Sequence, residues 1–572
     1  MFLSNPIGTH EAFSSENSAY APTWQSYGTI RPHGFVVTMK VPLRAIKGGA
    51  NGVWRVNFRR DVSRTLDTLD WSYGPTATAG SDPPAVDAGT MTGVPAQAIS
   101  HRPLPRLGLY GLAAMAAKSV GGNTSRVGAD LSLPITNTTS LVATVHPDYS
   151  NVEVDQQTIA PTAFQRYFNE VRPFFTQLSN YYNAFPCYSC NNVLPLYTTS
   201  IPTPRYGYAL EGKQGPISFA GFDAVGDGRD DNAQVVSVSS RDTRWSAMFQ
   251  RAGVSLPAVV DDVDTEGAGY DSTKGFTAGI TQMQERGSLV ADPAQAQFTM
   301  IGGGLYDKTQ GFYASLQRIG PQFSPFDGYV ANNGLGGYSA NYSKTWYRSE
   351  NAAIPRVLFF AETDLFHSAH GGIGQSDAQA AVGIDLQHVL GLRKLVHLRG
   401  QTGSSYVRLT DGNIVPVSQN GFDFTYDYRT ATPIALSYYW GRFGPGTLRY
   451  WSRSAAFQVT RDVTFDLEAD DSDQFLDRGP RNTQWLERAS LTWQPGRNTS
   501  LALGARRIIG VGPALEYSAI PSYTNAYNIS AAFYHRWPQA ELYVVYGDAS
   551  QFTTVPQFIV KLIRYFGAGK GT

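Results

Sequence analysis

Three carboxylates lie close together in one stretch of the sequence and could do chemistry: Glu153, Asp155 and Glu170. Hydrolysis of a glycosidic bond needs a pair of carboxyl groups, one acting as acid and one as base or nucleophile. Arg172 follows in the same stretch and could instead neutralise these acids inside a folded structure. No catalytic-domain pattern accompanies them, so the structural role is favoured. A secreted hydrolase of O-glycosyl bonds is kept as the alternative.

Further groups in the chain could bind metal. Cys187 and Cys190 form a CxxC pair with no second pair to complete a four-sulfur zinc site, so a local disulfide is favoured over free thiols. The acidic stretches 226–232 and 468–473 offer oxygen atoms suited to Ca²⁺, but without the spacing of a calcium loop. We interpret both as solvated turns or loops. The sequence therefore predicts no metal site, and Ca²⁺ is the one cofactor considered.

Three tryptophans in the first hundred residues are candidates for sugar binding: Trp24, Trp54 and Trp71. The flat face of an aromatic ring complements the C–H face of a pyranose. Trp54, however, lies in a regular apolar strand pattern. Packing in a core is therefore the favoured interpretation for these rings.

The elements that position these residues are predicted to be strands. Residues 421–430 alternate without a slip, so that an extended chain places their aromatic rings on one face and their polar groups on the other. The ring face comprises Phe422, Phe424, Tyr426 and Tyr428, and the polar face comprises Asp423, Thr425, Asp427 and Arg429. Rings that face lipid and charges that face a wet lumen are typical of membrane β-barrels.

Strand-length segments of this kind recur after about residue 100, between short turns and long loops such as 256–275 and 468–484. No run of 18 apolar residues exists that could form a spanning helix. We therefore expect an all-β protein: a large antiparallel transmembrane barrel of roughly 14–18 strands with a partly occluded lumen, after a small truncated N-terminal β-sandwich. A series of soluble β-sandwiches is the alternative.

Charge and the N-terminus limit the partners and the location. The 46 basic and 46 acidic residues give zero net charge, which argues against a nucleic-acid partner. The first residues show neither a basic leader nor an apolar export segment. Export to the outer membrane, with its lipid as partner, therefore requires that the N-terminus is truncated.

Two regions resemble known families. In the first hundred residues, Pro42, Leu43, Trp54, Asn57, Phe58 and Arg60 resemble the second half of a family 9-like carbohydrate-binding module. The stretch from His146 to Phe175 is similar to the signature of the domain-of-unknown-function family 5916. That signature falls on Pro147, Asp148, Glu153, Asp155, Phe164, Glu170, Arg172, Pro173, Phe174 and Phe175. The usual Leu-Glu-Gly continuation is replaced here by "TQLSNYYNAF".

The resemblance implies an architecture and a role. Family 5916 pairs such a module with a predicted outer-membrane barrel, so residues 1–100 are expected to be a partial sugar-binding sandwich and residues 101–572 a barrel. Residues 146–200 are expected to fill the lumen or to form a loop. The ending "QFIVKLIRYF" resembles the family's last strand, which would be recognised by the barrel-assembly machinery. The predicted function is a non-enzymatic barrel that binds or passes a carbohydrate or another polymer-derived ligand.

Overall fold

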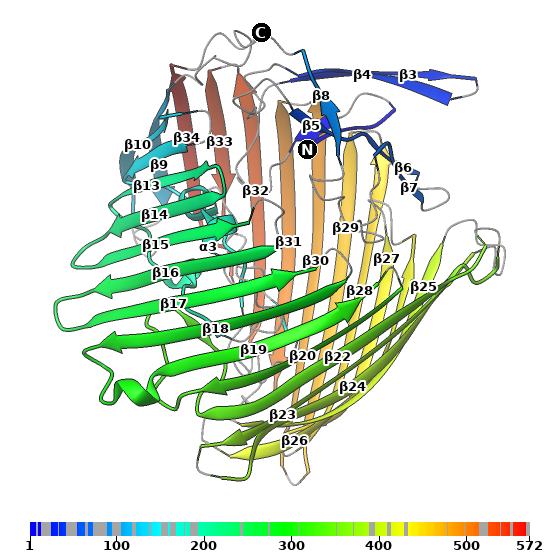
Figure 1. Ribbon diagram of the computed structural model, residues 1–572. Coiled ribbons are helices and arrows are strands. Elements are labelled where there is room, and N and C mark those ends of the chain that lie inside the picture. The colour runs from blue at the N-terminus through cyan, green and yellow to red at the C-terminus, as the bar shows by residue number, and fades with distance from the viewer. Residues whose placement is uncertain are drawn as a thin grey trace.

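Most of the chain forms one closed cylinder of strands, and short hairpins from the N-terminal hundred residues lie at one of its ends (Figure 1). This computed structural model describes residues 1–6, 10–12, 24–32, 34–41, 54–62, 67–72, 88–93, 105–116, 122–136, 139–149, 158–160, 167–176, 178–182, 193–240, 244–272, 275–307, 309–349, 352–369, 371–387, 395–408, 413–427, 433–444, 446–460, 462–477, 479–496, 498–513, 524–537, 539–548 and 553–567.

The barrel has 24 antiparallel strands, and each pairs with its neighbour in the sequence until the last, β34, pairs with the first, β9. The strands are β9 (Arg106–Ala116), β10 (Thr124–Pro134), β11 (Thr139–Val145), β13 (Tyr206–Gln214), β14 (Ile217–Val225), β15 (Asp230–Ser239), β16 (Trp245–Ser255), β17 (Val260–Asp271), β18 (Phe276–Gly287), β19 (Gln297–Tyr306), β20 (Gln310–Ile319), β22 (Leu335–Tyr347), β23 (Arg356–Ser368), β24 (Ile373–Leu386), β25 (Val396–Arg408), β26 (Ile414–Tyr426), β27 (Ile434–Phe443), β28 (Gly446–Thr460), β29 (Val463–Leu476), β30 (Arg481–Gly496), β31 (Thr499–Val511), β32 (Asn525–Trp537), β33 (Ala540–Tyr546) and β34 (Gln557–Phe566).

The predicted barrel is confirmed, but the predicted 14–18 strands were too few. Two segments that were expected to be long loops are largely strand: 256–275 contains β17, and 468–484 contains the end of β29 and the start of β30. Their acidic residues alternate between the two faces of the sheet instead of surrounding a loop. Asp262, for example, meets Arg251 of β16 at 2.9 Å on the outer face, while the adjacent Asp261 is buried inside. Acidic strands that pair their charges across the ladder are easily mistaken for loops.

The alternation of residues 421–426 has the predicted polarity. Phe422 is exposed and faces Tyr438 across the ladder, and Tyr438 stacks on Trp451 at 4.1 Å between ring centroids. Asp423 points to the other face and accepts a 2.5 Å hydrogen bond from the Tyr439 hydroxyl. Closing the sheet satisfies the backbone of every strand internally, which is what a barrel needs in hydrocarbon.

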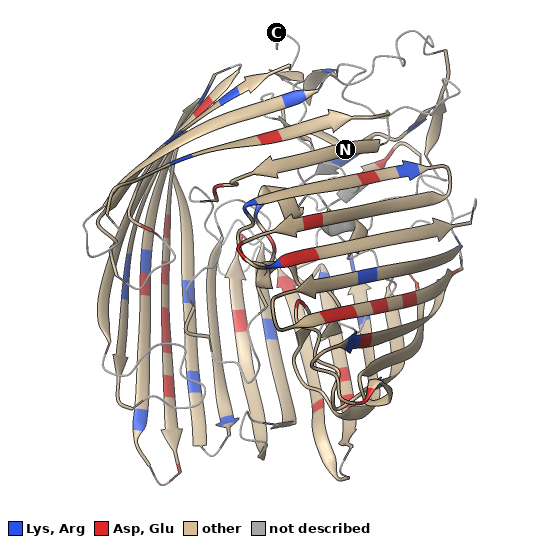
Figure 2. Ribbon diagram, turned by 90° about the vertical axis from the view of Figure 1, so that its left-hand side faces the viewer, with Lys and Arg blue, Asp and Glu red and all other residues tan. Residues whose placement is uncertain are grey.

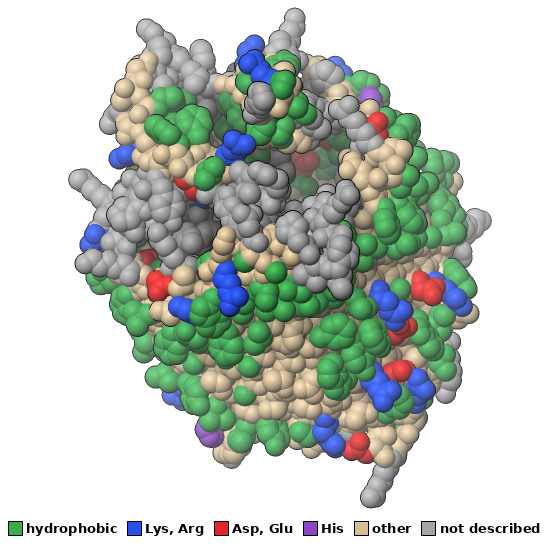
Figure 3. All heavy atoms as spheres, turned by 90° about the vertical axis from the view of Figure 1, so that its right-hand side faces the viewer, with side chains coloured by type: hydrophobic (Ala, Val, Ile, Leu, Met, Phe, Trp, Pro, Cys, Tyr) green, Lys and Arg blue, Asp and Glu red, His purple; other side chains and the backbone are tan. Residues whose placement is uncertain are grey.

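The outer face of the barrel is rich in apolar side chains (Figure 3). Ile280, Ile301 and Leu316 are exposed and lie in register across three consecutive strands, in the middle of β18, β19 and β20. Charged groups on this face include two pairs between neighbouring strands, Arg286 with Asp264 and Arg251 with Asp262. Figure 2 shows where basic and acidic residues lie along the strands. A closed sheet with an apolar outer surface is a membrane-spanning barrel of the outer-membrane kind.

We expect Ile301→Arg to destabilise the membrane-inserted barrel by about 2–4 kcal/mol, because a guanidinium at the bilayer midplane is costly. Gln379→Arg is the matched control, since Gln379 of β24 faces the lumen, where its amide donates a hydrogen bond to Glu362. Reversible urea unfolding in lipid vesicles, followed by tryptophan fluorescence, measures both variants. Equal stability of the two would contradict a lipid-facing position for Ile301.

The N-terminal residues form short antiparallel pairs among the described residues: β1 (Phe2–Ser4) with β2 (His10–Ala12), β3 (Gln25–Arg31) with β4 (Gly34–Lys40), β5 (Trp54–Val56) with β8 (Gly89–Met91), and β6 (Arg59–Val62) with β7 (Asp67–Asp70). The sandwich and the carbohydrate-binding module stay predictions. No helix among the described residues has both the length and the apolar character to cross a membrane.

Candidate functional site in the barrel lumen

A long insert between β11 and β13 packs against the inner wall of the barrel. Its two short helices, α2 (Pro173–Thr176) and α3 (Ser179–Tyr182), bring Phe174, Phe175 and Tyr182 around Phe222 of β14. The three rings meet the Phe222 ring edge-on, with centroid separations of 5.6–6.3 Å. Edge-to-face packing of buried rings is favourable beyond the area that it buries. The aromatic pair of the family signature therefore docks the insert onto the wall.

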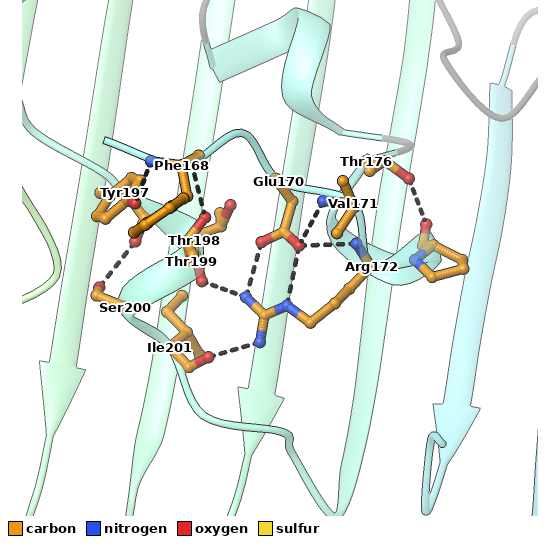
Figure 4. A network of polar contacts seen from close by, with 11 residues as sticks. Phe168, Glu170, Val171, Arg172, Thr176, Tyr197, Thr198, Thr199, Ser200 and Ile201 are labelled. Atoms are coloured by element: carbon orange, nitrogen blue, oxygen red, sulfur yellow. Dashed lines mark hydrogen bonds and ion pairs between the residues drawn. The ribbon is translucent and has the colours of Figure 1, made fainter. Parts of the chain in front are cut away.

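Glu170 and Arg172 hold the chain just before α2 (Figure 4). The guanidinium meets the carboxylate through two nitrogens, with Nε to Oε1 at 2.9 Å and Nη2 to Oε2 at 2.7 Å. Arg172 also donates to the carbonyl oxygens of Ile201 and Thr198, which lie near the end of the insert. Both side chains are more than 90% buried. The clamp thus ties the middle of the insert to its end.

The insert also reaches the opposite wall of the barrel. Ile159 is fully buried against Tyr450, Leu486 and Ile508, which point inward from β28, β30 and β31. These strands lie across the cylinder from β14, which carries Phe222 (Figure 1). Described residues of one insert therefore contact both walls of the lumen.

A buried ion pair fastens the beginning of the insert to the last strand. Lys561 of β34 lies 3.2 Å from the Asp148 carboxylate and donates a 2.7 Å hydrogen bond to the Asp148 carbonyl oxygen. The neighbouring Tyr110 hydroxyl of β9 donates to the His146 carbonyl oxygen at 2.9 Å. Asp148 belongs to the family signature and Lys561 to the terminal strand, so two separately recognised motifs meet here.

A second loop, residues 320–334 between β20 and β22, folds inward and supports the insert. Its short strand β21 (Tyr329–Val330) pairs with β12 (Val193–Leu194) of the insert. Two wall carboxylates accept hydrogen bonds from its backbone, Glu285 from Ser324 N–H at 2.6 Å and Asp261 from Phe326 N–H at 2.8 Å. Arg229 bridges Asp327 of the loop to Asp231 of β15.

The charge balance at Asp327 predicts a pH dependence. The pKa of the Asp327 carboxyl is raised well above its ordinary value by burial and by the hydrogen bond and negative charge of Asp231. The Arg229 guanidinium opposes this rise, but it is shared between the two acids. Between the ordinary pKa and the raised one, the Asp327 carboxyl is protonated in the docked loop and ionised in the undocked loop. Docking therefore weakens as pH rises from the ordinary carboxyl pKa of about 4 towards and past neutrality.

We expect protease cleavage within residues 320–334 to be faster at pH 8 than at pH 5.5, and Asp327→Asn to remove most of that difference. Limited proteolysis of the detergent-solubilised barrel measures this, after correction for the pH dependence of the protease on an unfolded substrate. Asp307→Asn is the control, because Asp307 lies in an exposed turn. A pH dependence that survives in Asp327→Asn would contradict the assignment.

The wall formed by β23–β26 is polar and half-exposed towards the lumen. Glu362 and Asp364 of β23, Asp377 of β24 and Arg399 of β25 share the inward face with Asp423. Asp364 and Asp377 are register partners. A polar interior of this kind suits water and hydrophilic ligands.

Some residues that line the lumen were not predicted from the sequence. Ser472 and Gln484 are register partners and fully buried, and their side-chain polar atoms have no hydrogen-bond partner among the described residues. Asp470 lies next to them and accepts a hydrogen bond from Tyr450. All three belong to segments that were expected to be loops. The alternation of 468–474, read as a strand, is the signal that would have placed Asp470 and Ser472 in the lumen.

The acidic stretches considered for Ca²⁺ do not form a cage. Asp470 points inward, whereas Asp471 and Asp473 point outward to Arg453 and Arg481. In the other stretch, Asp231 is paired with Arg229. Among the described residues, no group of three or more His, Cys, Asp or Glu side chains is arranged to hold a metal ion.

Several predicted site residues can be placed and others cannot. Trp24 is buried beside Phe2 and Trp54 is buried in β5, whereas Trp71 is exposed and contacts Phe58. Sugar stacking by these rings stays a prediction. The described residues do not include Pro42, Leu43, Glu153, Asp155, Phe164, Cys187 and Cys190, so the disulfide and the proposed carboxylate pair lie outside them.

Similar solved structures include two siderophore receptors and a ferric citrate transporter. The siderophore receptor PirA from Pseudomonas aeruginosa and PirA from Acinetobacter baumannii each have 8% identity and a TM-score of 0.43, with 81% of this chain and 80% of theirs covered. The ferric citrate transporter FecA has 7% identity and a TM-score of 0.32, with 81% and 79% covered. At this identity they speak to fold alone. None of the curated proteins matches the chain.

The family comparison falls on the start of the barrel and most of the insert. Residues 103–184 match the model of the domain of unknown function DUF5916, and this range contains the whole signature recognised in the sequence. The carbohydrate-binding resemblance stays a prediction. The protein is therefore a large closed β-barrel of the outer-membrane kind, and its segment 103–184, which matches the DUF5916 model, includes the start of the lumen insert.

Proposed function

We propose that the protein is an outer-membrane receptor or transport barrel whose insert closes the lumen at rest. Its ligand is a carbohydrate or another hydrophilic, polymer-derived molecule. The observation that carries the proposal is that one insert contacts both inner walls, through Phe174 and Phe175 at β14 and through Ile159 at β28–β31.

The lining of the lumen supports a hydrophilic ligand. The β23–β26 wall presents carboxylates, amides and Arg399, whereas the described part of the insert packs apolar side chains against β14–β16. Such groups bind hydroxyl-rich molecules through directional hydrogen bonds. The location in the outer membrane and the contact with its lipid rest on the apolar outer face of the barrel.

Hydrolysis is not the function that we favour. Of the three acids considered for it, Glu170 is described, and both of its oxygens accept hydrogen bonds from Arg172. A general acid must carry a proton at working pH, and a facing guanidinium opposes this. The similar solved structures are receptors and a transporter.

Ion conductance tests the proposal. The full chain in planar bilayers is expected to conduct little, whereas a variant with residues 150–200 replaced by a short Gly-Ser linker is expected to conduct as an open pore. Heat-modifiable gel migration checks that both barrels are folded. In parallel, isothermal titration with defined oligosaccharides from neutral and acidic polysaccharides tests the ligand class. Equal conductance would refute closure by the insert, and absence of any oligosaccharide binding would refute the carbohydrate ligand.

A further inference from the structure

A cavity of about 150 Å³ opens beside the Glu170–Arg172 clamp. It is lined by Tyr167, Asn169, Glu170, Tyr182, Leu196, Tyr197, Thr198 and Thr199, all of which belong to the insert. One water takes up about 30 Å³ in the liquid, and drug-sized ligands need upwards of about 300 Å³. The cavity therefore suits a small molecule larger than a single water.

The cavity has no net charge. Glu170 is its one charged lining residue, and Arg172 neutralises it through two hydrogen bonds. An anionic ligand would meet the Glu170 carboxylate, and a cationic ligand would have to displace Arg172 from it. The electrostatics thus favour a neutral polar ligand.

One wall of the cavity offers an aromatic platform. Tyr167, Tyr197 and Tyr329 form a cluster with ring centroids 5.1–5.7 Å apart. Tyr197 is buried, and its hydroxyl accepts a 2.8 Å hydrogen bond from Phe168 N–H, which fixes the ring (Figure 4). Tyr167, supported from behind by Tyr197, is 46% exposed.

Hydrogen-bonding groups lie around this platform. The side chain of Asn169 is exposed and makes no hydrogen bond to the described residues, so both its donors and its acceptor are available. The Thr199 hydroxyl donates a long 3.4 Å hydrogen bond to the Phe168 carbonyl oxygen and retains its lone pairs. An exposed ring beside an amide and hydroxyls matches a pyranose, which has one apolar C–H face and a rim of hydroxyls.

We infer that this cavity binds a single neutral pyranose unit, stacked on Tyr167 and hydrogen-bonded to Asn169. The inference rests on the proposed function and gives it a ligand class. The cavity lies within the insert that closes the lumen, so the bound sugar contacts the chain next to the clamp.

Saturation-transfer NMR on the full chain in detergent micelles tests this, with D-glucose, D-galactose and N-acetyl-D-glucosamine as neutral probes and D-glucuronate and D-glucosamine as charged ones. We expect at least one neutral sugar to bind with millimolar affinity and to show the strongest transfer at the ring protons of one face. Tyr167→Ala should weaken binding about tenfold or more and Asn169→Ala several-fold, while Tyr167→Phe should retain it. Tyr208→Ala, an exposed tyrosine on the outer face, is the control.

Two results would overturn the inference. One is that no neutral sugar shows saturation transfer from the protein, and the other is that Tyr167→Ala binds the sugar with unchanged affinity. Stronger binding of a charged sugar than of every neutral one would overturn the electrostatic argument. If oligosaccharides bind in the calorimetric experiment while Tyr167→Ala changes nothing, the inference fails and the proposed function stands. If neither oligosaccharides nor single sugars bind, both fail.

Discussion

Arg172→Ala is expected to undock the lumen insert while leaving the barrel intact. The substitution leaves the buried Glu170 carboxylate without its partner and releases the carbonyl oxygens of Thr198 and Ile201. Loss of one member of a buried pair costs about 3–5 kcal/mol. Such a cost raises the undocked population roughly a hundred- to four-thousand-fold.

Two measurements detect the undocked insert. Protease cleavage between residues 167 and 201 should accelerate in proportion to the undocked population, since cleavage follows local opening. The conductance of the variant should rise towards that of the barrel without the insert. Heat-modifiable migration should stay as in the wild type.

The controls for Arg172→Ala separate pairing from charge. Arg205→Ala removes an exposed ion pair with Asp227 and should change stability by no more than about 1 kcal/mol. Glu170→Leu combined with Arg172→Met removes both charges and should be much milder than Arg172→Ala alone. An Arg172→Ala variant as resistant to protease as the wild type would show that the clamp does not hold the insert.

Phe222→Ala is the second substitution with a large expected effect. Phe222 is buried, and its ring meets Phe174, Phe175 and Tyr182. Replacing a buried phenylalanine with alanine typically costs about 3–5 kcal/mol. Here the substitution weakens the docking of the insert and leaves the barrel intact, because the backbone hydrogen bonds of β14 to β13 and β15 are unchanged.

The matched control for Phe222→Ala lies three residues away on the same strand. Phe219 has the opposite parity and faces outward beside Gly212, away from the insert. Protease cleavage of the insert should accelerate in Phe222→Ala and stay unchanged in Phe219→Ala. Equal acceleration in both variants would mean that the wall itself, and not the aromatic contact, has been damaged.

Which face of the barrel is apolar could be predicted, because the alternation of apolar and polar residues within each strand shows it. The alternation of residues 421–426 alone distinguishes the outer ring of Phe422 from the inner carboxylate of Asp423. The pairing of Glu170 with Arg172 was equally accessible, since the two residues are adjacent on one extended stretch. Glu170 lies in the clamp, and its structural role stays a prediction.

Two kinds of contact left no local trace in the sequence. The partner of Asp148 is Lys561, 413 residues away, and the sequence around either residue does not predict this contact. Strands with paired charges were also missed: in β17, Asp262 and Asp264 gain their partners from the adjacent strands β16 and β18. A single strand cannot reveal that such acids are neutralised, so the segment looked like a loop.

The contact of Lys561 with Asp148 has a consequence for biogenesis. The strand that supplies Lys561 is also the strand that closes the sheet against β9, and it is the last strand of the barrel. The lumen insert therefore gains this contact only after every strand of the barrel has been synthesised. A nascent chain that stops short of β34 lacks both the closing strand pair and the Lys561 contact, so one strand supplies the closure of the barrel and the attachment of its insert.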